Sequence, residues 1–150
     1  MSGFLDVLGR QTGRLMQLGL EPEPFGHFHD TDGAIRFFNG LRNRSRRPEL
    51  IERHLGLTYD TCHFAILREE PEFTLSAWEE NNIALCKVQF SNALECRICG
   101  EEDLERLRQF DDGVYFHQTS ILHREGAMLF PDLPNALAYG RDYAEEIRDS

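Results

Sequence analysis

The sequence predicts an α/β fold in which repeated strand–helix units build a parallel sheet. Short apolar runs of strand length alternate with amphipathic stretches along the chain, and such alternation implies parallel strands joined by right-handed crossovers. Several apolar runs end in acidic, amide or imidazole side chains, as strands do where their C-terminal ends build a site. With 150 residues and no low-complexity segment or linker, we expect a single domain over residues 1–150.

Composition narrows the class of protein. Asp and Glu number 26 against 16 Lys and Arg, a net charge of −10, which makes nucleic acid an unfavourable partner. No apolar run approaches the roughly 20 residues that cross a bilayer, and the N-terminus lacks a signal-peptide pattern. We therefore expect a cytoplasmic protein with no membrane span. The basic run 42–47 is interpreted as a solvated helix end rather than a phosphate site.

The first strand is predicted over 15–20, after a helix over 3–12 with apolar positions at helical spacing. Pro22 and Pro24 follow this strand. Because proline cannot continue a central strand ladder, the strand stops there and Glu21 stands at its C-terminal end. Glu23 competes with Glu21 as a ligand, but we favour Glu21, since Glu23 is held outward between the two prolines.

A polar loop and two helices come next. The loop contains His27, His29 and Asp30. The two histidines would share a face in an extended chain and could both bind a metal. We prefer the interpretation of a polar loop that precedes a helix cap. Cap residues at 31–32 predict a helix through about residue 41. A second helix is predicted from Pro48, closed by Gly56.

The stretch 57–66 is the one around which the chain is organised. Its strand is predicted to deliver Asp60 at the C-terminal end, and His63 from the turn that follows. Both side chains can then point into one shared depression at the C-terminal ends of the strands. The alternative is that Asp60 caps the next helix and His63 packs in a core.

The remaining elements continue the alternation. A helix is predicted over 71–80, a strand over 83–90 with Lys87 and Gln89 near its end, a helix over 103–110, and a fourth strand over 114–120 with His117 and Gln118. Residues 121–130 are interpreted as extended, in a hairpin arm, before a last helix introduced by two prolines. Lys87 either holds a substrate phosphate or carboxylate, acts as a base when desolvated, or snorkels from a buried strand.

The polar strand ends are expected to meet, because the C-terminal ends of parallel strands lie side by side. The four cysteines are interpreted as reduced thiols. Cys96 and Cys99 form a lone C-x-x-C without a second pair for zinc, and it is not clearly placed at the start of a helix for redox chemistry. The residues expected at the shared edge are Glu21, Asp60, His63, Lys87, Gln89 and His117.

These motifs carry a family resemblance. The run 60–64 resembles the D-x-x-H strand end of the xylose isomerase-like TIM barrels, the sugar-phosphate isomerase/epimerase superfamily, and 20–22 resembles the strand that supplies an earlier metal-binding Glu. More narrowly, the segments 21–24, 59–63, 87–94 and 115–118 are similar to the bacterial metabolite-traffic proteins of the EboE family. The likeness runs along most of the chain.

The resemblance implies a divalent metal (Mn²⁺, Mg²⁺, Co²⁺ or Zn²⁺) at a barrel mouth. Glu21 and Asp60 would be carboxylate ligands, and His63 would bind metal or a substrate hydroxyl. Gln89 stands where the wider superfamily has a ligand His, and His117 near its last ligand Glu. His63 and Lys87 are the candidate catalytic residues.

An eight-stranded barrel takes about 250 residues, so four strand–helix units are expected to form about half of a TIM-barrel-like fold, a fragment or a diverged half-barrel. Its open edges are expected to pair in a homodimer.

Two function classes remain. The first is a metal-dependent sugar or polyol isomerase- or epimerase-like enzyme of a metabolite-processing pathway. The second is a non-catalytic metabolite-binding or assembly module that keeps the pocket without the chemistry.

Overall fold

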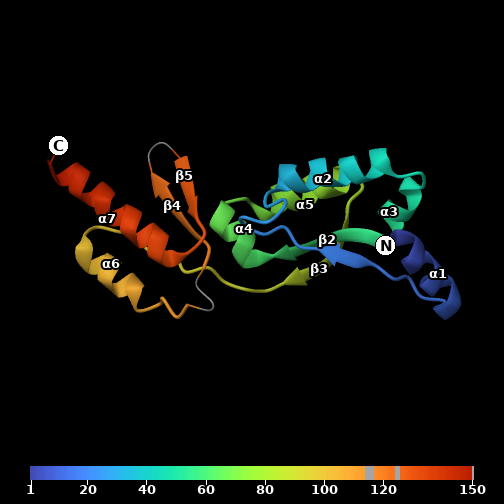
Figure 1. Cartoon of the computed structure of the whole chain (residues 1–150), viewed down its shortest axis with the longest axis horizontal. Coiled ribbons are helices and arrows are strands. Elements are labelled where there is room, and N and C mark those ends of the chain that lie inside the picture. The colour runs from blue at the N-terminus through green and yellow to red at the C-terminus, as the bar shows by residue number, and fades with distance from the viewer. Residues whose placement is uncertain (114–116, 124–125, 150) are drawn as a thin grey trace. The chain divides into compact units, whose positions relative to one another are not determined.

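The computed structural model describes residues 1–113, 117–123 and 126–149. The chain divides into two compact units, residues 1–92 and 93–150. Each unit has its own sheet and its own hydrophobic core, and Figure 1 follows the elements along the chain. The expected single-domain organisation of residues 1–150 stays a prediction.

The first unit is an α/β layer built on a three-stranded parallel sheet in the order β1-β2-β3. Figure 1 shows α2 and α5 side by side along one face of this sheet. The strands are β1 (Leu18–Leu20), β2 (Leu55–Asp60) and β3 (Ala84–Gln89), and the helices are α1 (Ser2–Thr12), α2 (Thr31–Arg44), α3 (Pro48–His54), α4 (Thr61–Leu67) and α5 (Pro71–Glu80).

The predicted α/β class and parallel strands are thus confirmed for the first unit, and most element positions follow the local signals. Pro48 and Pro71 each occupy the first turn of a helix, where the missing N–H costs nothing. Asn82 has a left-handed backbone with φ 53° just after α5, which asparagine tolerates better than most residues. Asp30, rather than the residues after it, caps α2 by accepting a bond from the Gly33 amide at 2.6 Å.

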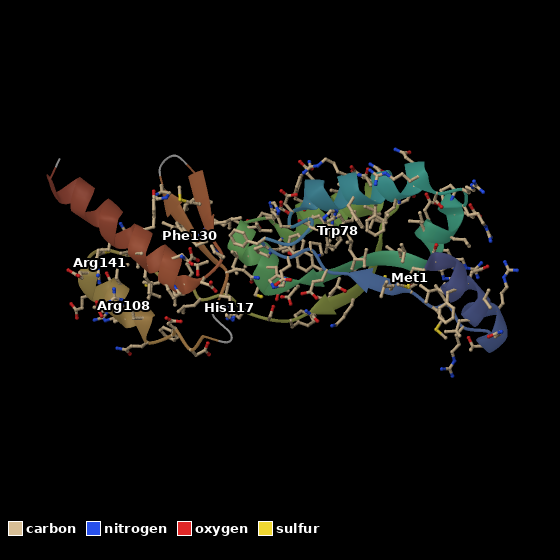
Figure 2. The ribbon with its side chains drawn as sticks, in the orientation of Figure 1. Met1, Trp78, Arg108, His117, Phe130 and Arg141 are labelled. Atoms are coloured by element: carbon tan, nitrogen blue, oxygen red, sulfur yellow. The ribbon has the colours of Figure 1, made fainter. Side chains whose placement is uncertain are left out.

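The core of the first unit lies between the central strand and the helices. Leu57 and Tyr59 of β2 are buried there, because alternate residues of a strand share a face. The Tyr59 ring stacks on Phe64 of α4 with centroids 4.4 Å apart, and Trp78 of α5 meets both rings edge-on. Figure 2 shows Trp78 between the helices and the sheet. These aromatic contacts anchor α4 and α5 to the strand that carries Asp60.

A β-bulge interrupts the pairing of β2 with β3. Gly56 and Leu57 pair with Ala84 and Leu85, but Thr58 pairs with Lys87, so the register shifts by one residue at Cys86. Bulges of this kind re-aim the side chains that follow them. Without the shift, Asp60 would pair with Val88; with it, Asp60 pairs with Gln89.

Gly56 lies beside this bulge, and the prediction that it closes α3 is wrong. It is the second residue of β2. A Cβ added to Gly56 would lie 2.3 Å from the Ala84 carbonyl oxygen and 2.5 Å from Cys86 Sγ. The absence of a side chain is what allows the two strands to approach at the bulge.

The second unit is built differently from the prediction. It holds α6 (Glu101–Arg108), β4 (Thr119–His123), β5 (Gly126–Phe130) and α7 (Leu133–Asp149), with Leu104, Leu133 and Leu137 at its core. The expected hairpin arm is confirmed, since β4 pairs antiparallel with β5.

The fourth parallel strand expected over 114–120 is wrong for the described residues 117–120. Residues 114–116 lie outside the described residues, His117 and Gln118 belong to no strand, and Thr119 begins β4. The physical reason is the short connection to β5: neighbouring strands so close in sequence pair antiparallel, whereas a parallel pair needs a crossover of about a dozen residues or more.

Within the residues that the structure describes, no helix is both long enough and apolar enough to cross a membrane.

Gly56→Ala should lower the free energy of unfolding by about 1–3 kcal/mol, the usual cost of overpacking, because the new methyl group meets backbone atoms of β3. The matched control is Gly40→Ala in α2, where an added Cβ meets nothing within 4 Å and should stabilise the helix by roughly 0.5–1 kcal/mol. Urea unfolding followed by circular dichroism measures both. Equal stability of Gly56→Ala and the parent would contradict the close approach.

Candidate functional site

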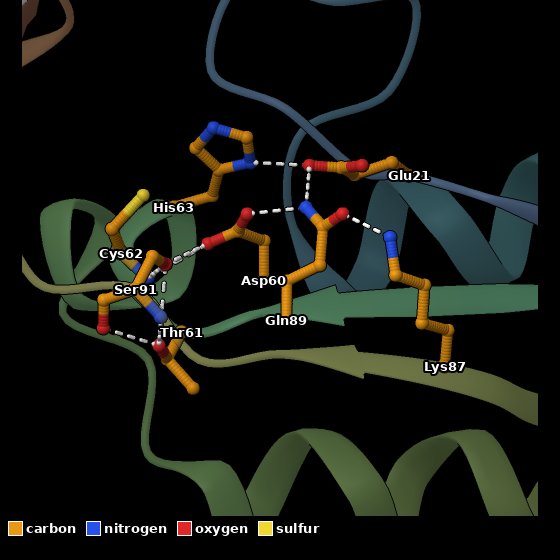
Figure 3. Close-up of polar contacts among 8 residues, drawn as sticks. All are labelled: Glu21, Asp60, Thr61, Cys62, His63, Lys87, Gln89 and Ser91. Carbon is orange, nitrogen blue, oxygen red and sulfur yellow. Dashed lines mark hydrogen bonds and ion pairs between the residues drawn. The ribbon is translucent and has the colours of Figure 1, made fainter. Parts of the chain in front are cut away.

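The ends of three parallel strands bring the predicted polar residues of the first unit together. Glu21 follows β1, Asp60 ends β2 and Gln89 ends β3. Asp60 and Gln89 are register partners, so their side chains leave the same face of the sheet. Figure 3 shows these three side chains converging from the three chain segments. Their predicted meeting at one sheet edge is therefore found in the structure.

Asp60 is buried and accepts three hydrogen bonds. Its Oδ1 accepts bonds from the Cys62 amide at 3.0 Å and from the Ser91 hydroxyl. Its Oδ2 accepts a bond from Gln89 Nε2 at 2.6 Å. Asp60 therefore caps α4 and at the same time faces the shared edge, so the two interpretations of this residue that the sequence left open both apply.

Gln89 bridges the two carboxylates. Its Nε2 donates to Asp60 Oδ2 and, at 3.1 Å, to Glu21 Oε1. Its Oε1 accepts a bond from Lys87 Nζ. A neutral amide thus separates two negative charges and connects them to a lysine, which offsets their mutual repulsion.

His63 lies in the first turn of α4 rather than in an open turn. Its Nδ1 is 3.3 Å from Glu21 Oε1, and the His63 side chain is 13 % exposed against 34 % for that of Glu21. The Nδ1 atom is buried and makes no hydrogen bond in the described residues. The His63 imidazole therefore faces the Glu21 carboxylate at ion-pair distance.

The pKa values of the two carboxyl groups move in opposite directions. Burial alone would raise the pKa of Asp60, but hydrogen bonds from Ser91, Cys62 and Gln89 outweigh it and lower the pKa from 3.8 to about 2. For Glu21, burial together with the charge of Asp60 raises the pKa above its ordinary value, against the opposing attraction of His63. Asp60 is held ionised, while Glu21 is the carboxyl group more easily protonated.

Two further residues belong to this edge although the sequence interpretation gave them no role. Ser91 lies two residues beyond β3, donates to Asp60 and accepts from the Cys62 amide at 2.9 Å. Its backbone N–H donates to Thr61 Oγ1 at 2.8 Å. The strand-end argument that selected Gln89 would also have selected Ser91. Cys62 lies within the D-x-x-H run, between Asp60 and His63.

The described residues contain one group of side chains with the spacing of metal ligands: Asp60, Cys62 and His63, whose ligand atoms all lie within 4.8 Å of one another. Glu21 reaches this group through His63, and the Gln89 amide stands between Glu21 and Asp60. The donor set fits a cation, because carboxylate, thiol and imidazole are all donor types that bind divalent metals.

Other candidates lie elsewhere. His117 belongs to the second unit, where its Nδ1 is 2.8 Å from Asp132 Oδ1; its place in the site stays a prediction. His27 contacts Phe37 edge-on at 5.6 Å and His29 Nε2 is 3.4 Å from Asp30 Oδ2, consistent with a polar loop before the α2 cap. The four cysteines, Cys62, Cys86, Cys96 and Cys99, are all free, and the last two are exposed.

Comparison with known proteins found no matching family model, no similar curated protein and no similar solved structure. The resemblance to the xylose isomerase-like barrels stays a prediction that rests on the motifs.

Asp60→Asn should destabilise the protein at neutral pH by at most about 2.5 kcal/mol, which is the shift in pKa from 3.8 to about 2 at about 1.4 kcal/mol per pKa unit. Because the pKa of Asp60 is lower in the folded state, its contribution is complete above pH 3.8 and is lost as the pH falls towards about 2. The variant should therefore lose this part of the acid-induced destabilisation.

Urea unfolding at several pH values between neutral and acid measures the effect. The matched control is Asp32→Asn, an exposed aspartate in the first turn of α2, which should keep the acid slope of the parent. An unchanged acid slope in Asp60→Asn would contradict the hydrogen-bonded, ionised carboxylate.

Proposed function

We propose that the C-terminal edge of the β1-β2-β3 sheet is the mouth of a partial, roughly half, TIM-barrel-like fold and binds a small polar metabolite of the sugar or polyol class. The support is chemical. Two carboxylates, an amide and a lysine gather at one exposed edge, and such groups recognise the hydroxyl groups of a polyol by charge-assisted hydrogen bonds. The reaction we propose is of the metal-dependent isomerase or epimerase type.

The observation that carries the enzymatic proposal is the difference in surroundings between the two carboxyl groups. Asp60 is buried and accepts three hydrogen bonds, whereas Glu21 accepts one from Gln89 and faces His63. A pair whose surroundings push their pKa values apart commonly divides into a fixed anion and a proton carrier. Asp60, held ionised, would anchor a divalent ion such as Mn²⁺, Mg²⁺, Co²⁺ or Zn²⁺, and Glu21 would accept and return a substrate proton. When bound, the ion would orient two substrate oxygens and stabilise negative charge.

The remaining residues have positioning and charge roles in this proposal. His63, 3.3 Å from Glu21, would hold a substrate hydroxyl or the ion and stabilise ionised Glu21. Lys87 is exposed and donates to Gln89, so it would turn towards a substrate phosphate or carboxylate. His117 lies in the second unit, and its expected role as a ligand stays a prediction.

A second candidate function is a metabolite-binding or assembly module without proton transfer. It is favoured by Gln89, whose amide nitrogen contacts both carboxylates at 2.6 and 3.1 Å. An amide that bridges Glu21 and Asp60 stabilises the pocket without an ion and has no proton to move. In this function the carboxylates would bind ligand hydroxyl groups directly.

Exchange of substrate hydrogen for deuterium distinguishes the two functions. The protein is incubated in D₂O with a panel of aldoses, ketoses and polyols and with each divalent ion in turn, and proton NMR follows the loss of carbon-bound hydrogen. The parent should catalyse metal-dependent exchange, and Glu21→Gln should abolish it because the proton acceptor is gone. Glu23→Gln, the same change two residues away, should retain it.

Saturable binding of a panel member without exchange would overturn the enzymatic proposal in favour of the binding module. Neither exchange nor binding would overturn both functions.

We also propose that two copies of the chain pair through the edge strands β1 and β3. Within the described residues each of these strands pairs only with β2. Apolar side chains are exposed along β3: Leu85 and Val88 are partly open, and Phe90, just after the strand, is 93 % exposed. Unpaired edges with exposed apolar residues favour association.

Sedimentation equilibrium should show a dimer at micromolar concentration, and Val88→Lys should shift it towards monomer, because a charge on an edge strand opposes pairing. The control is Leu122→Lys in β4, the same change at an exposed position of the other sheet, which should leave the dimer intact. A compact monomeric parent would contradict this prediction.

A further inference from the structure

We propose that Cys62 is a metal ligand, so that the ion bound at this edge is a thiolate-binding cation, Zn²⁺ or Co²⁺, rather than Mg²⁺ or Mn²⁺. The ligand set is Asp60, Cys62 and His63. The inference deepens the proposed function, since it names the metal class of the same site, and it adds a ligand that the sequence motifs did not suggest.

The geometry comes first. One ligand atom from each of the three side chains lies within 4.8 Å of the other two, so small side-chain movements would bring all three to the roughly 2.0–2.3 Å from a shared ion that zinc ligands adopt. Figure 3 shows the Cys62 sulfur and the His63 ring on the same side of the strand end as the Asp60 carboxylate. The fold itself therefore brings the three side chains close together.

The cluster is also held by the backbone. Asp60 is the N-cap of α4, and Cys62 and His63 lie in the first turn of that helix. The Cys62 amide donates both to Asp60 Oδ1 and, at 2.9 Å, to Ser91 Oγ. These bonds occupy Oδ1, while Oδ2 accepts only the Gln89 bond among the described contacts and keeps a lone pair for an ion.

The imidazole supplies the third donor. Either ring nitrogen of an imidazole can bind a metal. The His63 side chain is 13 % exposed, and its buried Nδ1 makes no hydrogen bond in the described residues but faces the Glu21 carboxylate as an ion pair. Glu21 lies 3.3 Å away from this nitrogen. Glu21 is thus placed to orient His63 or to receive a proton beside the ion, which is compatible with its proposed role as the proton acceptor.

Donor chemistry then selects the metal. A sulfur, a nitrogen and an oxygen donor suit Zn²⁺ or Co²⁺, whereas Mg²⁺ and Mn²⁺ prefer oxygen donors. Three protein ligands leave a fourth, open position, as in catalytic zinc sites. Burial raises the pKa of the Cys62 thiol, so without metal it is protonated; as the sulfur–metal bond forms, the thiol releases one proton to solvent.

Cobalt spectroscopy tests the thiolate directly. The full chain is titrated with Co²⁺ under a non-thiol reductant, and absorbance is recorded. The parent should develop a sulfur-to-cobalt charge-transfer band together with the intense visible bands of tetrahedral Co²⁺, and Zn²⁺ should displace both. Cys62→Ser should lose the charge-transfer band and bind Zn²⁺ at least about tenfold more weakly. Serine keeps the backbone N–H that donates to Asp60, so the capped turn is preserved.

The matched control is Cys86→Ser, which changes the other partly buried thiol of the same unit and should keep the band and the Zn²⁺ affinity of the parent. Circular dichroism on each variant checks the fold, and Cys62→Ala serves as a second variant.

A charge-transfer band that survives in Cys62→Ser and Cys62→Ala would overturn the inference. So would cobalt bound without the band and with equal affinity in the parent and both variants. In that case the ion rests on carboxylates and imidazole, and the isomerase-type proposal stands. A parent that binds neither Co²⁺ nor Zn²⁺ would overturn the inference as well, and the deuterium-exchange result with Mg²⁺ or Mn²⁺ would then decide the proposed function separately.

Discussion

The side-chain contacts of Asp60 hold the first unit together at the C-terminal ends of its parallel strands. One carboxylate caps α4 through the Cys62 amide, receives the Gln89 amide from β3 and receives the Ser91 hydroxyl from the segment beyond β3. The start of α4 and the segment at the end of β3 are thus both tied to one anion. Because every one of these donors favours the ionised form, the group is at once a structural cap and a permanent negative charge at the mouth of the sheet.

That charge contributes to the properties of the neighbouring residues. Burial raises the pKa of Glu21, and the Asp60 charge adds to this rise against the attraction of His63. The Gln89 amide fits the space between the two carboxylates because it donates to both. An ion at this edge and the Gln89 amide would compete for the same oxygens. A cation that relies on Cys62 and His63 needs only the free lone pair of Asp60 Oδ2, whereas one held between Glu21 and Asp60 must displace the amide. The metal-binding and metal-free functions would therefore differ in whether an ion or the Gln89 amide contacts the carboxylate oxygens.

Among the described residues of the expected fourth parallel strand, His117 and Gln118 lie outside any strand and Thr119 begins the antiparallel hairpin instead. Periodicity marks a stretch as extended but does not name its partner. The residues of β4 have the same apolar character as those of β2, yet β4 pairs antiparallel with β5, its close neighbour in the chain. The first unit succeeded because helices separate its strands, and a helix-length connection permits parallel pairing.

By itself, the sequence determined the positions of most helices and of the three parallel strands, through proline at helix starts and at the end of β1, and through the alternation that buries Leu57 and Tyr59. It also placed Glu21 and Asp60 at strand ends. Only the tertiary structure decided that Gln89, rather than Val88, stands beside Asp60, because the bulge at Cys86 shifts the register by one residue. That choice depends on the contact of Gly56 with a strand 28 residues further along, which no local pattern encodes.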